Sequence, residues 1–146
     1  MGTELQQAAR TLAMASRGLE KAAAPLSLPQ YRILALIATA PERASRVAQR
    51  ADVTKATLTG VIDSLVAHGW IERTNVAGDR RGVSLTLTSC GAAVLAEAES
   101  AMGAWLERIL DRVGPSAAGE VGTAMATLYA GLAADRRARD EERASR

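Results

Sequence analysis

Three cationic side chains occupy positions that suit contacts with a nucleic-acid backbone. Arg80 and Arg81 lie in the short, glycine-containing loop NVAGDRR (residues 75–81), and Lys55 lies near the start of a helical pattern. Arginine is a long, permanently charged donor that suits phosphates or the electronegative minor groove. The sequence therefore predicts that these side chains bind double-stranded DNA. The alternative interpretation is an ordinary solvated loop.

Other kinds of chemistry have few candidate residues in this chain. One histidine, His68, and one cysteine, Cys90, leave no ligand set for a metal and no combination of acid, base and nucleophile. We therefore expect no enzymatic activity, no metal and no cofactor. Cys90 lies at the start of a predicted helix, where the helix dipole favours a reactive thiolate, so a thiol redox sensor is an alternative function.

The segment from Thr54 to Ala67 predicts the helix that would place side chains against the bases. Thr54 is suited to cap it, because a threonine hydroxyl accepts a hydrogen bond from a free amide of the first turn. Apolar residues recur at helical spacing and predict a buried side: Leu58, Val61, Ile62 and Leu65. The opposite side carries only small or short residues: Ala56, Thr59, Gly60, Asp63 and Ala67. So slim a face suits a major groove about 12 Å wide; the alternative is a surface helix that happens to have small residues.

A shorter helix is predicted before this one, and a β-hairpin after it. Residues 45–50 (SRVAQR) predict a short helix, and Asp52 lies in the following turn, where it tolerates a left-handed backbone. Gly69 suits the end of the second helix. Residues 70–74 (WIERT) and the alternating residues 83–88 (VSLTLT) predict two strands. This order of elements predicts a winged helix-turn-helix.

These segments resemble the MarR (multiple antibiotic resistance regulator) family. Asp79 to Gly91 reads DRRGVSLTLTSCG and is similar to that family's wing signature, D-x-R-x-x-x-L-x-L-T-x-x-G. Residues 26–38 (LSLPQYRILALIA) and 65–73 (LVAHGWIER) resemble its second helix and the end of its recognition helix. The resemblance spans nearly the whole chain. It implies a homodimeric transcriptional regulator, usually a repressor, that binds a short pseudo-palindromic operator and is often released by a small ligand or by oxidation.

The helical pattern and the resemblance together give a predicted set of DNA-binding residues. These are Ser45, Thr54, Lys55, Ala56, Thr57, Thr59, Gly60, Ser64, Arg80 and Arg81. The resemblance implies that Asp79 supports the wing through an ion pair with an arginine, and that Arg81 reaches the minor groove with the assistance of Arg80. Many relatives have a basic residue at the positions of Gly60 and Ser64, so the base-reading contacts of this chain differ from theirs.

The rest of the chain predicts four longer helices that position this DNA-binding part: residues 4–23, 29–39, 91–113 and a last helix from 116. The predicted fold class is mainly α with a small β-hairpin wing (α+β). Residues 41–90 form the winged helix-turn-helix lobe, and residues 1–40 and 91–146 form a helical dimerisation lobe with a linker helix. The first, fifth and sixth helices would pair with a second copy, because their apolar stripes otherwise stay uncovered. The alternative is an intramolecular bundle in a monomer.

Composition limits the function without deciding it. The formal net charge is +2 and the pI is about 9.1, which permits nucleic-acid binding without demanding it. No apolar run approaches the roughly 18 residues that span a bilayer, and we expect a cytoplasmic protein without membrane contact. A winged-helix module that binds proteins instead of specific DNA is the main alternative.

A small-molecule effector is a further expectation that comes from the resemblance. Ligands in this family bind between the helical and winged lobes, so Tyr31, Arg32 and Trp105 are candidates. For each of these residues the alternative is ordinary packing or solvation. The identity of the ligand, and the residues that bind it, cannot be deduced from the sequence.

Overall fold

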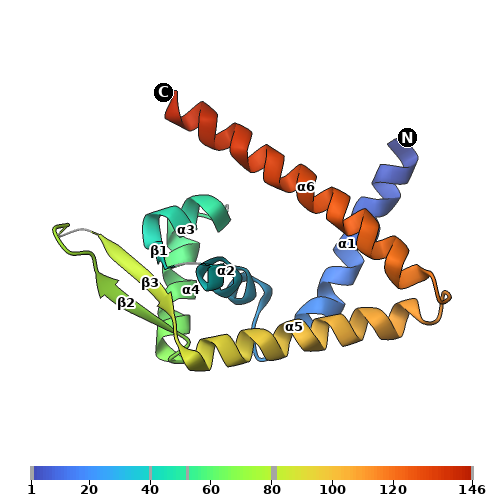
Figure 1. The fold of residues 1–146 in the computed structure, drawn as a ribbon, viewed down its shortest axis with the longest axis horizontal. Helices are drawn as coiled ribbons and strands as arrows, with labels where there is room; N and C mark the ends of the chain where they lie inside the picture. Colours follow the sequence, from blue (N-terminus) through green and yellow to red (C-terminus); the bar gives the residue numbers. More distant parts are fainter. Residues whose placement is uncertain (1, 40, 52, 80–81, 146) are drawn as a thin grey trace. The chain divides into compact units, whose positions relative to one another are not determined.

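The computed structural model describes residues 2–39, 41–51, 53–79 and 82–145. It is mainly helical with a small antiparallel sheet, which confirms the predicted fold class (Figure 1). The elements run in the order α1 (Gly2–Ala22), α2 (Leu28–Thr39), β1 (Glu42–Arg43), α3 (Ala44–Ala51), α4 (Lys55–Ala67), β2 (Ile71–Asn75), β3 (Val83–Leu87), α5 (Ser89–Leu110) and α6 (Ala117–Ala144). None of these helices combines the length and the apolar character that crossing a membrane requires.

Contacts between residues group the chain into two compact units, residues 1–105 and residues 106–146. The first unit contains every element from α1 to β3 and most of α5. The second contains the end of α5 and α6. The candidate site described below lies entirely within the first unit.

The sheet has the strand order β1-β3-β2, with both pairs antiparallel. In the hairpin, Ile71 lies opposite Leu87 and Asn75 lies opposite Val83. The alternating pattern of residues 83–88 predicted the second of these strands. Strand β1 was not predicted from the sequence. It pairs Arg43 with Ser84 and has only two residues, which is too short to show any periodicity.

The core of the first unit gathers apolar side chains from α2, α3, α4, the sheet and α5. Its most buried large members are Leu26, Ile33, Leu34, Val47, Leu65, Ile71 and Leu85. On α4, Leu58 and Ile62 are 4% exposed and Leu65 is fully buried, which confirms the predicted inner side of that helix. Burial of such side chains is worth about 1.5–3 kcal/mol each, so this side fixes how α4 lies on the core.

The junction between the hairpin and α5 is tight. Gly69 has a positive φ of 69°, as expected for the residue that ends α4. The next residue, Trp70, is 8% exposed, and its carbonyl oxygen would lie 2.0 Å from a Cβ atom placed on Gly91. A side chain at position 91 would therefore force this junction apart, which gives a physical reason for the glycine that closes the wing signature.

Helix ends differ from the prediction by a few residues, for local reasons. Helix α5 begins two residues before Gly91, and the hydroxyl of Thr88 accepts a hydrogen bond from the Gly91 amide at 2.9 Å, as a capping residue does. The segment from Asp135 continues α6 to Ala144 and is exposed, and Asp135 pairs with Arg139 one turn later. The turn residue Asp52 lies outside the described residues.

Candidate nucleic-acid interface

Helix α4 begins at a threonine cap, as predicted. Thr54 has an extended backbone (φ −65°, ψ 152°), and its hydroxyl accepts a hydrogen bond from the amide of Thr57 at 3.2 Å. The hydroxyls of Thr54 and Thr57 lie 2.8 Å apart and also bond to each other. Both threonines therefore set the start of the helix, and their hydroxyl groups bond within the chain.

The outer side of α4 is exposed along its whole length, and its side chains are short except for Lys55. The exposed residues are Lys55, Ala56, Thr57, Thr59, Gly60, Asp63 and Ala67. A Cβ atom placed on Gly60 would meet nothing within 4 Å, so the surface there is open. Thr59 donates its hydroxyl to the carbonyl oxygen of Lys55 at 2.9 Å. The helix can thus be approached closely from outside.

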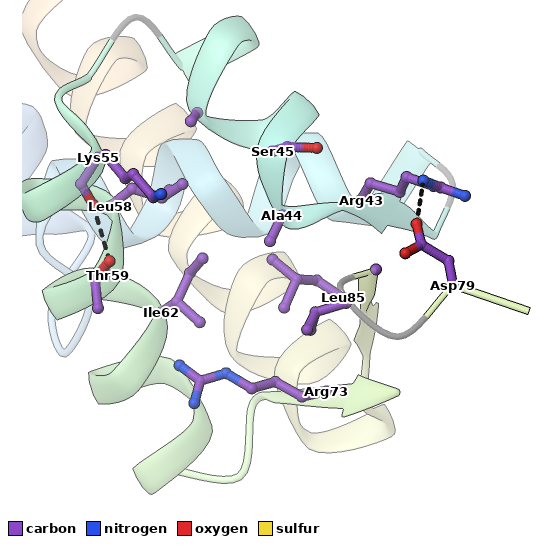
Figure 2. A pocket seen from close by; sticks show the side chains of 13 residues that line it. Arg43, Ala44, Ser45, Lys55, Leu58, Thr59, Ile62, Arg73, Asp79 and Leu85 are labelled. Atoms are coloured by element: carbon purple, nitrogen blue, oxygen red, sulfur yellow. Dashed lines mark hydrogen bonds and ion pairs between the residues drawn. The ribbon is translucent and has the colours of Figure 1, made fainter. Parts of the chain in front are cut away.

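A groove of about 650 Å³ runs beside α4 and is lined by α3, α4 and the sheet (Figure 2). Its apolar lining includes Leu58 and Ile62 of α4 and Leu85 of β3. Its polar lining comes from Arg43, Ser45, Lys55, Thr59, Arg73 and Asp79. Three of these six side chains are cationic and one is acidic, so the groove places net positive charge between the recognition helix and the wing.

Within the described residues, two ion pairs hold the wing relative to its neighbours. Arg43 Nη1 lies 3.1 Å from Asp79 Oδ2, which joins β1 to the wing loop (Figure 2). Arg73 of β2 pairs with Asp63 on the outer side of α4. Asp79 thus makes an ion pair with an arginine, and among the described residues that arginine is Arg43. Arg80 and Arg81, the predicted DNA-contacting residues of the wing, lie outside the described residues.

The remaining predicted site residues lie in different surroundings. Ser45 is exposed in α3, whose inward residue Val47 is fully buried. Ser64 is half-buried on the flank of α4 that faces α2, and its hydroxyl accepts a hydrogen bond from Gln30 Nε2 at 3.0 Å. Ser64 is therefore separated from the groove that Ser45 and Lys55 share.

Sequence reasoning named neither Arg43 nor Arg73 as a site residue. For Arg43 a signal existed, because the resemblance requires an arginine partner for Asp79, but the sequence does not say which arginine. Arg73 follows Glu72 in β2, and every residue of this strand after Ile71 is exposed, on both faces of the strand. Its pairing with Asp63 depends on how β2 packs on α4, and ten residues separate the partners in sequence.

The residues predicted as candidates for ligand binding or redox sensing lie on α2 and α5. Tyr31 is half-buried and Arg32 is exposed on α2, and Trp105 of α5 packs its indole where a Cβ of Gly18 in α1 would be. Burial, followed by the negative charge and hydrogen bond of the Glu99 carboxylate, raises the pKa of Tyr31. Cys90 is exposed in the first turn of α5.

Part of the chain is similar to known proteins. Residues 24–82 match a model described as MarR family. A segment of 73 residues is 37% identical to the HTH-type transcriptional repressor YetL of Bacillus subtilis (strain 168) and covers 48% of this chain and 44% of YetL. The chain thus matches less than half the length of this relative.

Solved structures of similar fold cover most of the chain. Wild-type MarR of E. coli in its apo form has a TM-score of 0.70 and 27% sequence identity, and the match covers 90% of this chain and 96% of that one. A mutant MarR of E. coli complexed with operator DNA has a TM-score of 0.64 and 22% identity, covering 86% and 95%. NadR in complex with 4-hydroxyphenylacetate has a TM-score of 0.64 and 26% identity, covering 90% of each chain.

Proposed function

We propose that the chain, whose residues 24–82 match a model of the MarR family, is a sequence-specific DNA-binding transcriptional regulator. It acts as a homodimer on a short pseudo-palindromic operator, and as a repressor, the role that the name of YetL gives to that relative. The observation that carries the proposal is the exposed, short-chained outer side of α4 beside a cationic groove and wing.

In this proposal the two parts of the winged lobe contact DNA differently. The outer side of α4 enters the major groove, where Ala56, Thr59 and Gly60 face base edges. Lys55, Arg80 and Arg81 bind phosphates or the minor groove, and Asp79 supports the wing. The complex of a MarR mutant with operator DNA supports this use of the fold.

The homodimer is supported by apolar side chains that the single chain leaves exposed. On α6 these are Met125, Leu128, Tyr129 and Leu132, which repeat at helical spacing and are 40–69% exposed. On α1, Leu5 is 69% and Met14 is 79% exposed. A second copy that covers these residues would also place two α4 helices in successive major grooves, about 34 Å apart.

The proposal includes release of the operator by a small molecule, with Tyr31 among the residues that contact it. It is supported by the complex of NadR with 4-hydroxyphenylacetate. The first probe is that compound itself: a rise in melting temperature with increasing 4-hydroxyphenylacetate, together with weaker operator binding, is the expected result. Unchanged melting and unchanged DNA binding would exclude this compound as the effector.

The experiment that tests the proposed function is a gel-shift titration of the full chain against DNA flanking its own coding sequence. It is run at two salt concentrations with excess nonspecific competitor, alongside a selection from random duplexes. A discrete, competitor-resistant and salt-sensitive complex is expected. If both experiments give only diffuse, competitor-sensitive binding, the chain is better explained as a protein-interaction module.

A further inference from the structure

The outer side of α4 has few of the side chains that usually identify bases by paired hydrogen bonds. Arginine or lysine reads guanine, and asparagine or glutamine reads adenine, through two hydrogen bonds each. Of these four residue types, Lys55–Ala67, a segment that the structure describes completely, contains only Lys55, at its first position. Beyond Lys55, base identity must therefore be read on this helix by something other than a bidentate hydrogen bond.

The threonine hydroxyls and the Asp63 carboxylate of the outer side already bond within the protein. The Thr59 hydroxyl donates to the Lys55 carbonyl oxygen at 2.9 Å, and the hydroxyls of Thr54 and Thr57 bond to each other. The carboxylate of Asp63 pairs with Arg73. Because each hydroxyl has a single proton, the proton of Thr59 is not available to a base while this bond persists.

Methyl groups are then the main contact surface that α4 can offer to the floor of the major groove. Thr59 is exposed and is the fifth residue of the helix, in the half of a recognition helix that contacts base edges. Gly60, with open space around it, and the short Ala56 allow the backbone to approach closely. Thymine is the base that presents a methyl group in the major groove.

We propose that Thr59 is a specificity-determining residue that recognises thymine by contact between its γ-methyl group and the C5-methyl group of the base. This inference rests on the proposed DNA-binding function and adds the identity of a base that the operator must contain. Each half-site then has a thymine at the position opposite Thr59. The contact is apolar, so it discriminates thymine from deoxyuridine, which has the same hydrogen-bonding groups and lacks the methyl.

The test uses a duplex selected from random sequences by the full wild-type chain. Each thymine is replaced in turn by deoxyuridine, and binding is measured by fluorescence anisotropy. Loss of one buried methyl contact should weaken binding about fourfold at one position of each half-site. Replacements at the other thymines serve as internal controls and should leave the affinity unchanged.

Two variants of Thr59 form a matched pair for the same measurement. Thr59→Ser keeps the hydroxyl and removes the methyl, so it should bind the thymine and deoxyuridine duplexes equally. Thr59→Val removes the hydroxyl and keeps a methyl, so it should retain the preference for thymine. Since residue 59 is exposed, both variants should fold, which circular dichroism and thermal melting will check.

The possible results separate this inference from the proposed function. If the wild-type chain selects a duplex but binds its deoxyuridine forms with equal affinity, methyl recognition is wrong and the DNA-binding function stands. If the preference for thymine persists in Thr59→Ser, Thr59 is not the residue that reads it. If the chain selects no duplex at all, the proposed function is wrong and this inference fails with it.

Discussion

The Nη1 atom of Arg43 lies 3.1 Å from the Oδ2 atom of Asp79, and this ion pair connects the short strand β1 to the wing loop across 36 residues of sequence. The two side chains are 52% and 41% exposed, so the pair contributes at most about 1 kcal/mol to the stability of the fold. Its effect should therefore be seen mainly in how the wing meets DNA.

Replacing Asp79 by asparagine distinguishes two roles for this pair. If the carboxylate only added negative charge near DNA, Asp79→Asn would strengthen binding. If the ion pair holds the wing in its binding orientation, we expect operator binding to weaken by up to about fivefold, with little change in melting temperature. Anisotropy titrations at fixed salt measure the affinity, and stronger binding by the variant would contradict the supporting role.

Gly60→Ala should separate fold stability from DNA binding. Nothing lies within 4 Å of the added Cβ, so the alanine should stabilise α4 by about 0.5–1 kcal/mol. The same methyl should hinder close approach to the bases and lower operator affinity. Gly103→Ala in α5, where space is also open, is the control and should leave DNA binding unchanged. Unchanged operator affinity of Gly60→Ala would show that α4 does not approach DNA at this residue.

The side chains of Ser64 and Gln30 should stabilise the fold through the hydrogen bond between them, so the effects of replacing them should not be additive. Gln30 Nε2 donates to the Ser64 hydroxyl at 3.0 Å in a part-buried position, so Ser64→Ala should cost about 1 kcal/mol by leaving the amide without this acceptor. Urea unfolding of Ser64→Ala, Gln30→Ala and the double variant measures the coupling. Strictly additive losses would mean that this hydrogen bond contributes nothing.

The raised pKa of Tyr31 predicts that the fold loses stability at alkaline pH. Its pKa is raised in the folded state above the unfolded value of 10.0, so its stabilising contribution is complete below pH 10.0 and is lost as pH rises through the folded pKa. Tyr31→Phe should therefore show a smaller fall in the free energy of unfolding above pH 10 than the wild type. Tyr129→Phe, at a residue that is 69% exposed, is the control. Equal alkaline losses in wild type and Tyr31→Phe would contradict this interpretation.

A charge in the apolar face of α6 should disrupt the proposed dimer. Leu128→Glu would place a carboxylate where the second copy packs, and we expect a monomer in sedimentation velocity and greatly reduced operator binding. Ala130→Glu introduces the same charge about 200° further round the helix and should remain dimeric. A dimeric Leu128→Glu variant would exclude this face as the contact.

Much of the winged lobe could be predicted from the sequence because its signals are local. The spacing of Leu58, Ile62 and Leu65 identifies the buried side of α4, and the hydroxyl of Thr54 identifies its start. Alternation from residue 83 onward likewise identifies β3. Each of these features depends on residues within about two turns of one another, which a periodic pattern can reveal.

The parts that were missed depend on contacts between distant segments. Strand β1 exists because Arg43 pairs with Ser84, and two residues alone carry no strand pattern. The partners of Asp63 and Asp79 could not be chosen from many arginines without the packing of the hairpin. Ser64 is in the predicted DNA-binding set, but the position of Gln30 on α2, which the sequence does not reveal, determines its surroundings.

The open surface around Gly60 also has an evolutionary consequence. Ala56, Thr59 and Gly60 are all exposed, so replacing any of them leaves the apolar core intact. If α4 reads the operator as proposed, descendants of this chain can acquire a different operator through single substitutions, without first accumulating stabilising changes elsewhere. A duplicated copy of the gene could diverge in its target sites while the fold itself stays constant.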